Sequence, residues 1–203
     1  MIYGCRGFML LKKTAAAAFC VMLLSAQMPV SAADMTWSYD EESATVSVKG
    51  YGMINDATQL KQYLDRAKRI NVLGGVTKID RNVFTDCGNV EEVILPDGFL
   101  SVGDNSFSMS KSLKTINFPD TLESIGNEAF MSCSSLENVT IPKSVSSIGK
   151  NAFGECVNVR EFKVSEENSI YSEIDGIIFS KDGTELILYP PGMEAESYAV
   201  PEN

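Results

Sequence analysis

Histidine is absent from this sequence of 203 residues. Its absence excludes Ser-His and Cys-His nucleophile pairs and metal sites with histidine ligands. A phosphate-binding glycine loop is absent too, because Gly74-Gly75 precedes a repeat unit and not a helix. Acidic clusters occur at Asp40-Glu41-Glu42, Glu91-Glu92 and Glu166-Glu167, but nothing marks two carboxylates as the pair, about 5–10 Å apart, that a glycosidase requires. We therefore expect no enzymatic activity, no metal site and no cofactor.

Basic residues are scarce, with 17 Lys and Arg against 27 Asp and Glu and a net charge of −10. The remaining chain is more acidic still without residues 1–32, which carry Arg6, Lys12 and Lys13 and no acid. Such a charge repels nucleic acid and anionic membranes over the Debye range, so we expect no nucleic-acid partner. Solubility is the simpler explanation of the acidity, and an acidic face for basic partners or divalent ions is the alternative.

Long apolar runs are confined to the N-terminus. Residues 1–32 combine a basic start with the apolar segment 14–24, which is too short to span a bilayer comfortably. Val30-Ser31-Ala32 then supplies small residues before a cleavage point near Ala32 or Ala33. The pattern predicts a Sec signal peptide, a secreted or cell-surface location, and no transmembrane segment in the mature chain.

A repeat occupies the middle of the chain. Residues 76–167 are four consecutive copies of one 23-residue unit, and in steps of 23 six columns are apolar at all 24 positions. Stacked units would bury these side chains, whereas an isolated unit would expose them. The columns are Val76, Phe99, Leu122 and Val145; Ile79, Val102, Ile125 and Ile148; Phe84, Phe107, Phe130 and Phe153; Val90, Leu113, Leu136 and Val159; Val93, Ile116, Val139 and Phe162; and Leu95, Phe118, Ile141 and Val164.

Each unit predicts one short strand. In Leu136–Pro142 the side chains of Val139 and Ile141 are two apart and point to one side, and the proline ends the strand. Earlier in the same unit Gly126 supplies a turn, and residues 127–130 suit a short helical or 3₁₀ turn on the opposite wall. These elements predict an α/β repeat solenoid.

The segments on either side of the repeats predict caps. Residues 33–75 form the N-terminal cap, with a β-hairpin over 34–54, an amphipathic helix over 56–69 and a strand at Ile70 and Val72. The basic side chains of the helix read as a solvated face rather than a binding patch. They are Lys61, Arg66, Lys68 and Arg69.

Residues 168–203 predict a C-terminal β-hairpin and a partial repeat. The hairpin pairs Ile177–Ser180 with Leu186–Tyr189. Because Ile187 and Tyr189 precede Pro190 as apolar residues precede proline in the repeats, we expect the repeat sheet to resume at Ile187.

The cysteines that follow the signal peptide share one column of the repeat. At the 23-residue spacing the column contains Cys87, Ser110, Cys133 and Cys156. Rungs stacked roughly 5 Å apart would allow a Cys133–Cys156 bridge. Buried free thiols are the favoured interpretation, because free cysteine is among the most buried residue types.

The string I-G-x-x-A-F-x-x-C-x-x-L-x-x-V-x-I-P, carried by Ile125–Pro142, resembles the BspA-like (Treponema pallidum type) leucine-rich repeat. Residues 37–53 resemble that family's N-terminal segment, and residues 175–190 resemble its recurring hairpin. The resemblance implies a leucine-rich-repeat-like right-handed superhelix of short strands, curved and located outside the cell or on its surface. It also implies an adhesive role, since family members include adhesins that bind host matrix proteins.

Any specificity is expected on the strand face between the core positions, because solenoids commonly bind there. We predict a non-enzymatic binding or adhesion module whose partner is an extracellular protein or polysaccharide. A structural spacer or assembly element is the alternative, a carboxylate-based hydrolase is a second one, and the sequence does not indicate an oligomeric state. The candidate binding residues, stacked on the inner curve, are Glu92, Ile94, Thr115, Asn117, Asn138, Thr140, Glu161 and Lys163.

Overall fold

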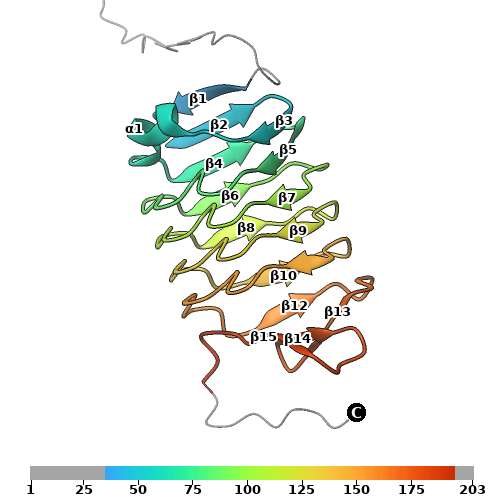
Figure 1. Ribbon diagram of the computed structural model, residues 1–203. Coiled ribbons are helices and arrows are strands. Elements are labelled where there is room, and N and C mark those ends of the chain that lie inside the picture. The colour runs from blue at the N-terminus through green and yellow to red at the C-terminus, as the bar shows by residue number, and fades with distance from the viewer. Residues whose placement is uncertain (1–34, 195–203) are drawn as a thin grey trace, which may run out of the picture.

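The repeats build a β-solenoid of about five turns with very little helix. A computed structural model describes residues 35–194 and shows the turns stacked in one column between an N-terminal and a C-terminal cap (Figure 1). The predicted signal peptide and the last part of the predicted partial repeat lie outside the described residues. Within residues 35–194, no helix has the length and hydropathy needed to cross a bilayer.

The first wall of the solenoid is the predicted strand ladder. Its strands pair in parallel at the 23-residue step, so that Val93 lies beside Ile116. Within the described chain the ladder is interrupted once, because β8 and β10 are not hydrogen-bonded to each other. The strands are β1 (Thr36–Asp40), β2 (Thr45–Lys49), β4 (Arg69–Val72), β6 (Glu92–Ile94) and β8 (Thr115–Asn117), followed by the separate pair β10 (Val139–Ile141) and β12 (Phe162–Val164).

A second parallel sheet forms the adjacent wall, and sequence reasoning missed it. Each turn contributes a strand to this sheet, and most of these strands are two residues long. Val102, for example, lies beside Ile125. So short a strand contributes one buried side chain and shows no alternation. The strands are β3 (Gly52–Ile54), β5 (Val76–Ile79), β7 (Ser101–Val102), β9 (Ser124–Ile125) and β11 (Ser147–Ile148).

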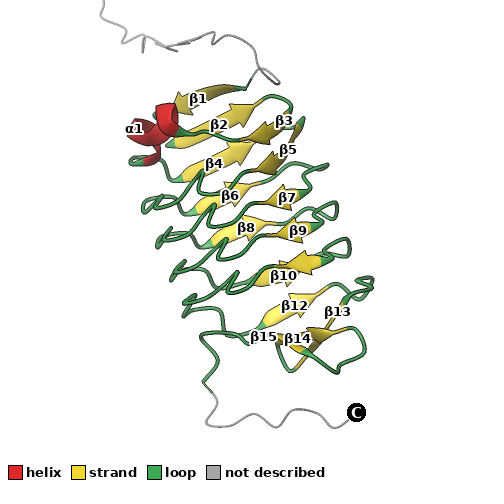
Figure 2. Ribbon diagram, viewed as in Figure 1, coloured by secondary structure: helices red, strands yellow, loops and turns green. Residues whose placement is uncertain are grey.

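The third wall consists of turns, and the predicted helical or 3₁₀ turns are wrong. Within the described chain the only helical segments are a 3₁₀ turn at Thr58–Leu60 and α1 (Lys61–Leu64), both in the N-terminal cap (Figure 2). Two residues per turn of the solenoid adopt a left-handed φ, which does not propagate a right-handed helix. They are Asn82 and Asp86, Asn105 and Met109, Glu128 and Ser132, and Asn151 and Glu155.

These left-handed residues let alternate N–H groups of the turn wall donate to the next turn of the solenoid. The N–H of Phe84 donates to the carbonyl of Ser106 at 2.8 Å, and one turn later the N–H of Phe107 donates to the carbonyl of Ala129 at 2.8 Å. Alternate N–H groups on this wall are therefore satisfied between consecutive turns, and those between them donate within their own turn, as the N–H of Ser108 does to Asn105 O at 3.2 Å.

Phenylalanines stacked along the solenoid form the centre of the core. Phe84, Phe107, Phe130 and Phe153 are at most 1% exposed. Their ring centroids are 5.5, 5.5 and 5.2 Å apart, with interplanar angles of 18°, 3° and 6°. The 23-residue period places the same ring at the same point of every turn, so the rings stack face to face.

The N-terminal cap confirms the predicted hairpin and strand but shortens the helix. β1 and β2 pair antiparallel, and β4 lies parallel to β2. Helical structure covers residues 58–64 rather than 56–69. The chain leaves the helix before residue 69, because the N–H groups of Lys68 (2.8 Å) and Arg69 (3.3 Å) donate to Ala44 O and not to the preceding helical turn.

The C-terminal cap confirms the predicted hairpin, in which β14 (Ile177–Ser180) pairs antiparallel with β15 (Leu186–Leu188). A third strand, β13 (Tyr171–Ile174), pairs with the other edge of β14. The expectation that the repeat sheet resumes at Ile187 is wrong, because β15 belongs to this antiparallel sheet. The cap joins the solenoid through the N–H of Phe162, which donates to Gly176 O at 2.8 Å.

Asn168 marks the point where the repeat ends. It follows Val145 by 23 residues, so it occupies a position of an apolar column, and it is 1% exposed. Its Nδ2 donates to the carbonyls of Pro142 (2.7 Å) and Val145 (2.9 Å). Its Oδ1 accepts the N–H groups of Ile170 (2.9 Å) and Tyr171 (2.8 Å). The amide thus ties the last turn to the start of the cap.

Candidate functional site

A shallow groove of about 640 Å³ opens at the interruption between β8 and β10. Thr115 and Asn117 of β8 line one side, and Asn138 and Thr140 line the other. Thr140 is exposed while its neighbours Val139 and Ile141 are buried, because alternate side chains of a strand point to opposite faces. Four of the predicted binding residues therefore meet in one depression of the first wall.

Phe118 lies at the base of the groove, beside the interruption. It is the only aromatic residue in its core column, where the other turns carry Leu95, Ile141 and Val164. Its ring packs edge-on against Phe130 with centroids 5.7 Å apart. We infer that this wider side chain keeps β8 away from β10. As a result Ile116 and Phe118 are half-buried and form an apolar floor.

Asn117 holds the adjacent side of the ladder in place. Its Oδ1 accepts the N–H of Leu95 at 2.7 Å, and its Nδ2 donates to Leu95 O at 3.0 Å. The side chain therefore continues the β6–β8 ladder past the last strand bond. In contrast, the structure shows no hydrogen bond within residues 35–194 from the side chains of Thr115, Asn138 and Thr140. Their hydroxyl and amide groups are available to a ligand.

The other four predicted binding residues do not join the groove. Glu92 forms an ion pair with Arg69 at 2.6 Å, and Ile94 is half-buried on β6. Glu161 and Lys163 lie beside β10 and pair with each other at 3.4 Å. The structure thus divides the predicted surface into a groove and two flanks, and the binding role of all eight residues stays a prediction.

Charges around the groove are mostly compensated. Glu91 lies between Lys68 and Lys114, with an N–O distance of 2.7 Å to each. Hydrogen bonds from Lys114 and then Lys68 lower the pKa of the Glu91 carboxyl to about 2. On the other rim Lys143 lies 3.4 Å from both Asp120 and Glu167, and its pKa is raised by the hydrogen bond to Asp120 first and then by the charge of Glu167.

Three of the four basic side chains predicted to lie on the cap helix, those of Arg66, Lys68 and Arg69, are compensated in the same way. Besides Lys68 and Arg69, Arg66 pairs with Glu41 at 3.1 Å. All these side chains are also well exposed. The arrangement agrees with a solvated face and leaves little free positive charge for an anionic partner.

The acidic and thiol side chains are the groups on which the expectations for metal and nucleophile chemistry depend. Within residues 35–194, no three His, Cys, Asp or Glu side chains are placed to hold a metal ion. Cys87, Cys133 and Cys156 are buried and free, as favoured from the sequence. Burial, followed by the charges of Asp86 and Asp65, raises the pKa of Cys87 to about 12, so this thiol stays protonated and is a poor nucleophile.

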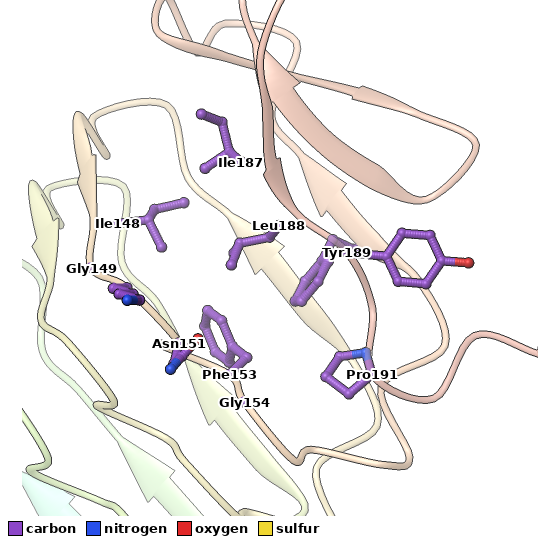
Figure 3. Close-up of a pocket in the computed structure, with 11 residues that line it drawn as sticks. Ile148, Gly149, Asn151, Phe153, Gly154, Ile187, Leu188, Tyr189 and Pro191 are labelled. Carbon is purple, nitrogen blue, oxygen red and sulfur yellow. The ribbon is translucent and has the colours of Figure 1, made fainter. Parts of the chain in front are cut away.

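A second cavity of about 290 Å³ lies between the last turn of the solenoid and the C-terminal cap. Figure 3 shows Ile148, Phe153 and Leu188 around this space, with the backbone of Gly149 at its edge. Sequence reasoning missed the cavity because it placed residues 187–189 in the repeat sheet. The lining is mixed, with Lys150 and Asn151 beside the apolar side chains.

The family described as the BspA type leucine rich repeat region matches residues 62–184 in six copies. None of the curated proteins matches the chain. Among solved structures, a leucine-rich repeat protein from Eubacterium ventriosum is 24% identical with a TM-score of 0.67, and the match covers 85% of this chain and 52% of that one.

Two further solved structures share the fold. The pneumococcal vaccine antigen PcpA is 23% identical with a TM-score of 0.60, and the match covers 83% of this chain and 57% of that one. A leucine rich cell surface protein from Faecalibacterium prausnitzii is 19% identical with a TM-score of 0.50, covering 88% and 66%. The chain therefore spans little more than half the length of the first two proteins, and these likenesses establish the fold. Together with the repeat matches, they show that the chain belongs to the BspA-type leucine-rich repeat family.

Proposed function

We propose that this chain is a non-enzymatic binding module located outside the cell or on its surface, and that its ligand occupies the groove between β8 and β10. The composition of the groove is the observation that supports the proposal most directly. The groove is the place on the strand face where exposed, uncommitted hydroxyl and amide groups surround an apolar floor. Sites that bind small ligands commonly combine an apolar lining with a few polar groups that orient the ligand.

Two further observations support this function. Two of the matched structures are described as a vaccine antigen and a cell surface protein, which fits the signal peptide predicted over residues 1–32. One acidic pair singled out in the sequence is also committed elsewhere, since Glu91 and Glu92 both lie in ion pairs. A pair of free carboxylates for hydrolysis therefore has no support at these positions.

Binding of the full chain to immobilised matrix proteins and polysaccharides would test the proposal. The variant Thr115→Lys/Asn138→Lys/Thr140→Lys should lose binding, because three long charged side chains would fill the groove. Asn117 is left unchanged because its side chain supports the backbone of Leu95.

The matched control is Ser144→Lys/Ser146→Lys/Ser147→Lys, which adds the same charge at exposed positions near β11 on the second wall. It should bind as the unchanged protein does. Equal loss in both variants would indicate a general charge effect, and full binding by the groove variant would refute the assignment of the site.

A structural role in assembly is the second candidate. Exposed apolar side chains lie near the C-terminal end of the solenoid, including Val157 (57% exposed) and Leu186 (42%). Contiguous exposed apolar surface often marks a contact between proteins. Light scattering would favour this role if it detects ordered oligomers in the absence of ligand, and Val157→Ser/Leu186→Ser should then shift the protein to monomers.

A further inference from the structure

We propose that the ligand of the groove is a neutral polysaccharide, bound through a short stretch of its sugar units. This inference rests on the proposed binding function and narrows it to one class of ligand. Four features of the groove carry it, namely its fixed width, its polar groups, its apolar floor and its charge.

The groove cannot admit a peptide strand between β8 and β10. The two turns that carry these strands are fixed on the other walls, where Ile125 of β9 lies beside Ile148 of β11. On the turn wall the N–H of Met109 donates to Met131 O at 2.7 Å. A strand inserted into a sheet needs about 4.8 Å on each side, so the spacing of these walls would have to double. The ligand must therefore lie on the face and contact side chains.

The polar groups of the groove suit hydroxyl-rich ligands. Thr115 and Thr140 each offer a hydroxyl that both donates and accepts, and Asn138 offers an amide with both functions. They project from two neighbouring turns, on either side of the groove. A sugar ring presents its own hydroxyls as adjacent donors and acceptors, so one unit can bond to groups on both strands at once.

The floor suits the apolar face of a sugar ring. Ile116 and Phe118 are half-buried at the base of the groove, and the edge-on contact with Phe130 fixes the Phe118 ring. Carbohydrate rings expose C–H groups on one face, which gain by leaving water against an apolar surface. The volume of about 640 Å³ falls in the range of pockets that hold small ligands.

The charge of the site favours a neutral ligand over an acidic one. Asp120 is the only charged residue that lines the groove, and its charge is offset by Lys143 at 3.4 Å. No base lines the groove to pair with uronate or sulfate groups, and the chain as a whole carries −10. Acidic polysaccharides should therefore be repelled, whereas neutral ones meet no penalty.

Calorimetric titration of the full chain would test this inference with neutral glucan, mannan, galactan and N-acetylglucosamine oligomers. Uronate and sulfated oligomers of equal length serve as the acidic comparison. We expect binding of at least one neutral oligomer, with affinity changing less than about twofold when salt rises from about 0.05 to 0.5 M. The variant Thr115→Val/Thr140→Val should weaken binding about tenfold, because it removes two hydroxyls and keeps the side-chain shape.

The matched control is Thr36→Val on β1, an exposed strand threonine far from the groove, and it should bind normally. Amide hydrogen exchange should also show added protection of β8 and β10 when the oligomer binds. Preference for acidic oligomers, or unchanged affinity in the double valine variant, would overturn the inference. If no oligomer binds but a matrix protein does, and the groove lysine variant abolishes that binding, the polysaccharide is refuted and the proposed function stands. If no ligand depends on the groove, both fall.

Discussion

Replacing Asn168 by alanine should destabilise the junction between the solenoid and the C-terminal cap by about 3–4 kcal/mol. The amide makes four hydrogen bonds at 2.7–2.9 Å and is 1% exposed. Two of its four partners keep a hydrogen bond without the amide. Pro142 O also accepts the N–H of Val145, and Ile170 is exposed enough for water to reach its N–H. The carbonyl of Val145 and the N–H of Tyr171 are left buried and unpaired, at about 1–3 kcal/mol each.

The assay is equilibrium unfolding in urea, combined with amide hydrogen exchange. Contacts in a solenoid are between neighbouring turns, so the loss should appear first as faster exchange in β13 and β14. Asn158→Ala is the matched control, because Asn158 is exposed in the preceding turn. Its exchange pattern and unfolding midpoint should match those of the unchanged protein.

Two further substitutions separate hydrogen bonding from filling of space. Asn168→Leu restores apolar volume at a position whose column equivalents are apolar, yet it should remain destabilised because the same backbone groups stay unpaired. Asn168→Asp places a carboxylate against the carbonyls of Pro142 and Val145. Its pKa in the folded state should therefore be raised, so this variant should regain stability below about pH 4 and lose it as pH rises toward 7.

The stability of Asn168→Leu distinguishes hydrogen bonding from filling of space at this position. If this variant is as stable as the unchanged protein, position 168 is an ordinary core position and the hydrogen-bond reasoning is refuted. If it behaves as the alanine variant does, the four bonds anchor the cap.

Four further predictions follow from individual side chains. A carboxyl NMR titration should place the pKa of Glu91 near 2. The ionised carboxyl therefore stabilises the fold fully above its ordinary pKa of 4.5, and this stabilisation is lost as pH falls toward 2. Lys114→Met should raise the pKa of Glu91, and an unchanged pKa would contradict the ion pair. Iodoacetamide at about pH 8 should leave the three buried cysteines unmodified in the folded protein and modify them after unfolding, as peptide mass mapping would show. Glu128→Asn should raise stability by about 0.5–1 kcal/mol in thermal unfolding, because φ at this residue is 53° and asparagine tolerates the left-handed region better. Phe118→Ile should close the interruption between β8 and β10, seen as slower amide exchange in both strands; unchanged exchange would show that the ring does not separate them.

The core of the fold was predictable from the sequence. All six apolar columns contribute to the core, and of their members only Ile116, Phe118, Ile148 and Val164 are half-buried rather than buried. The repeat strands and both hairpins also occur where the alternation placed them. Such patterns are readable because a fixed period repeats one local environment, so each unit confirms the assignment of the others.

The second sheet and the turn wall were not predictable in the same way. Strands such as Ser101–Val102 are too short to show a period. The turn residues gain their backbone partners from the next turn, as Phe107 does from Ala129. A propensity for helix in the isolated segment is overridden when alternate N–H groups, such as those of Asn105, Phe107 and Met109, find acceptors 22 residues away in the next turn.

The candidate site was likewise only partly predictable from the sequence. The sequence identified the strand-face residues, yet it treated eight of them as one continuous surface. The structure selects Thr115, Asn138 and Thr140, commits Asn117 to the backbone of Leu95, and pairs the flanking charges. These differences depend on side-chain volume and distance between turns, which a column of letters does not contain.

The sequence by itself determined that this chain stacks as a repeat, because a 23-residue apolar period has no other way to bury its side chains. It also determined the absence of histidine chemistry. Only the tertiary structure decided where the repeat opens and where it stops. A phenylalanine in place of a smaller residue lies where two strands part, and an asparagine occupies an apolar column where the stack ends. Both features depend on contacts between turns that are distant in the sequence and adjacent in space.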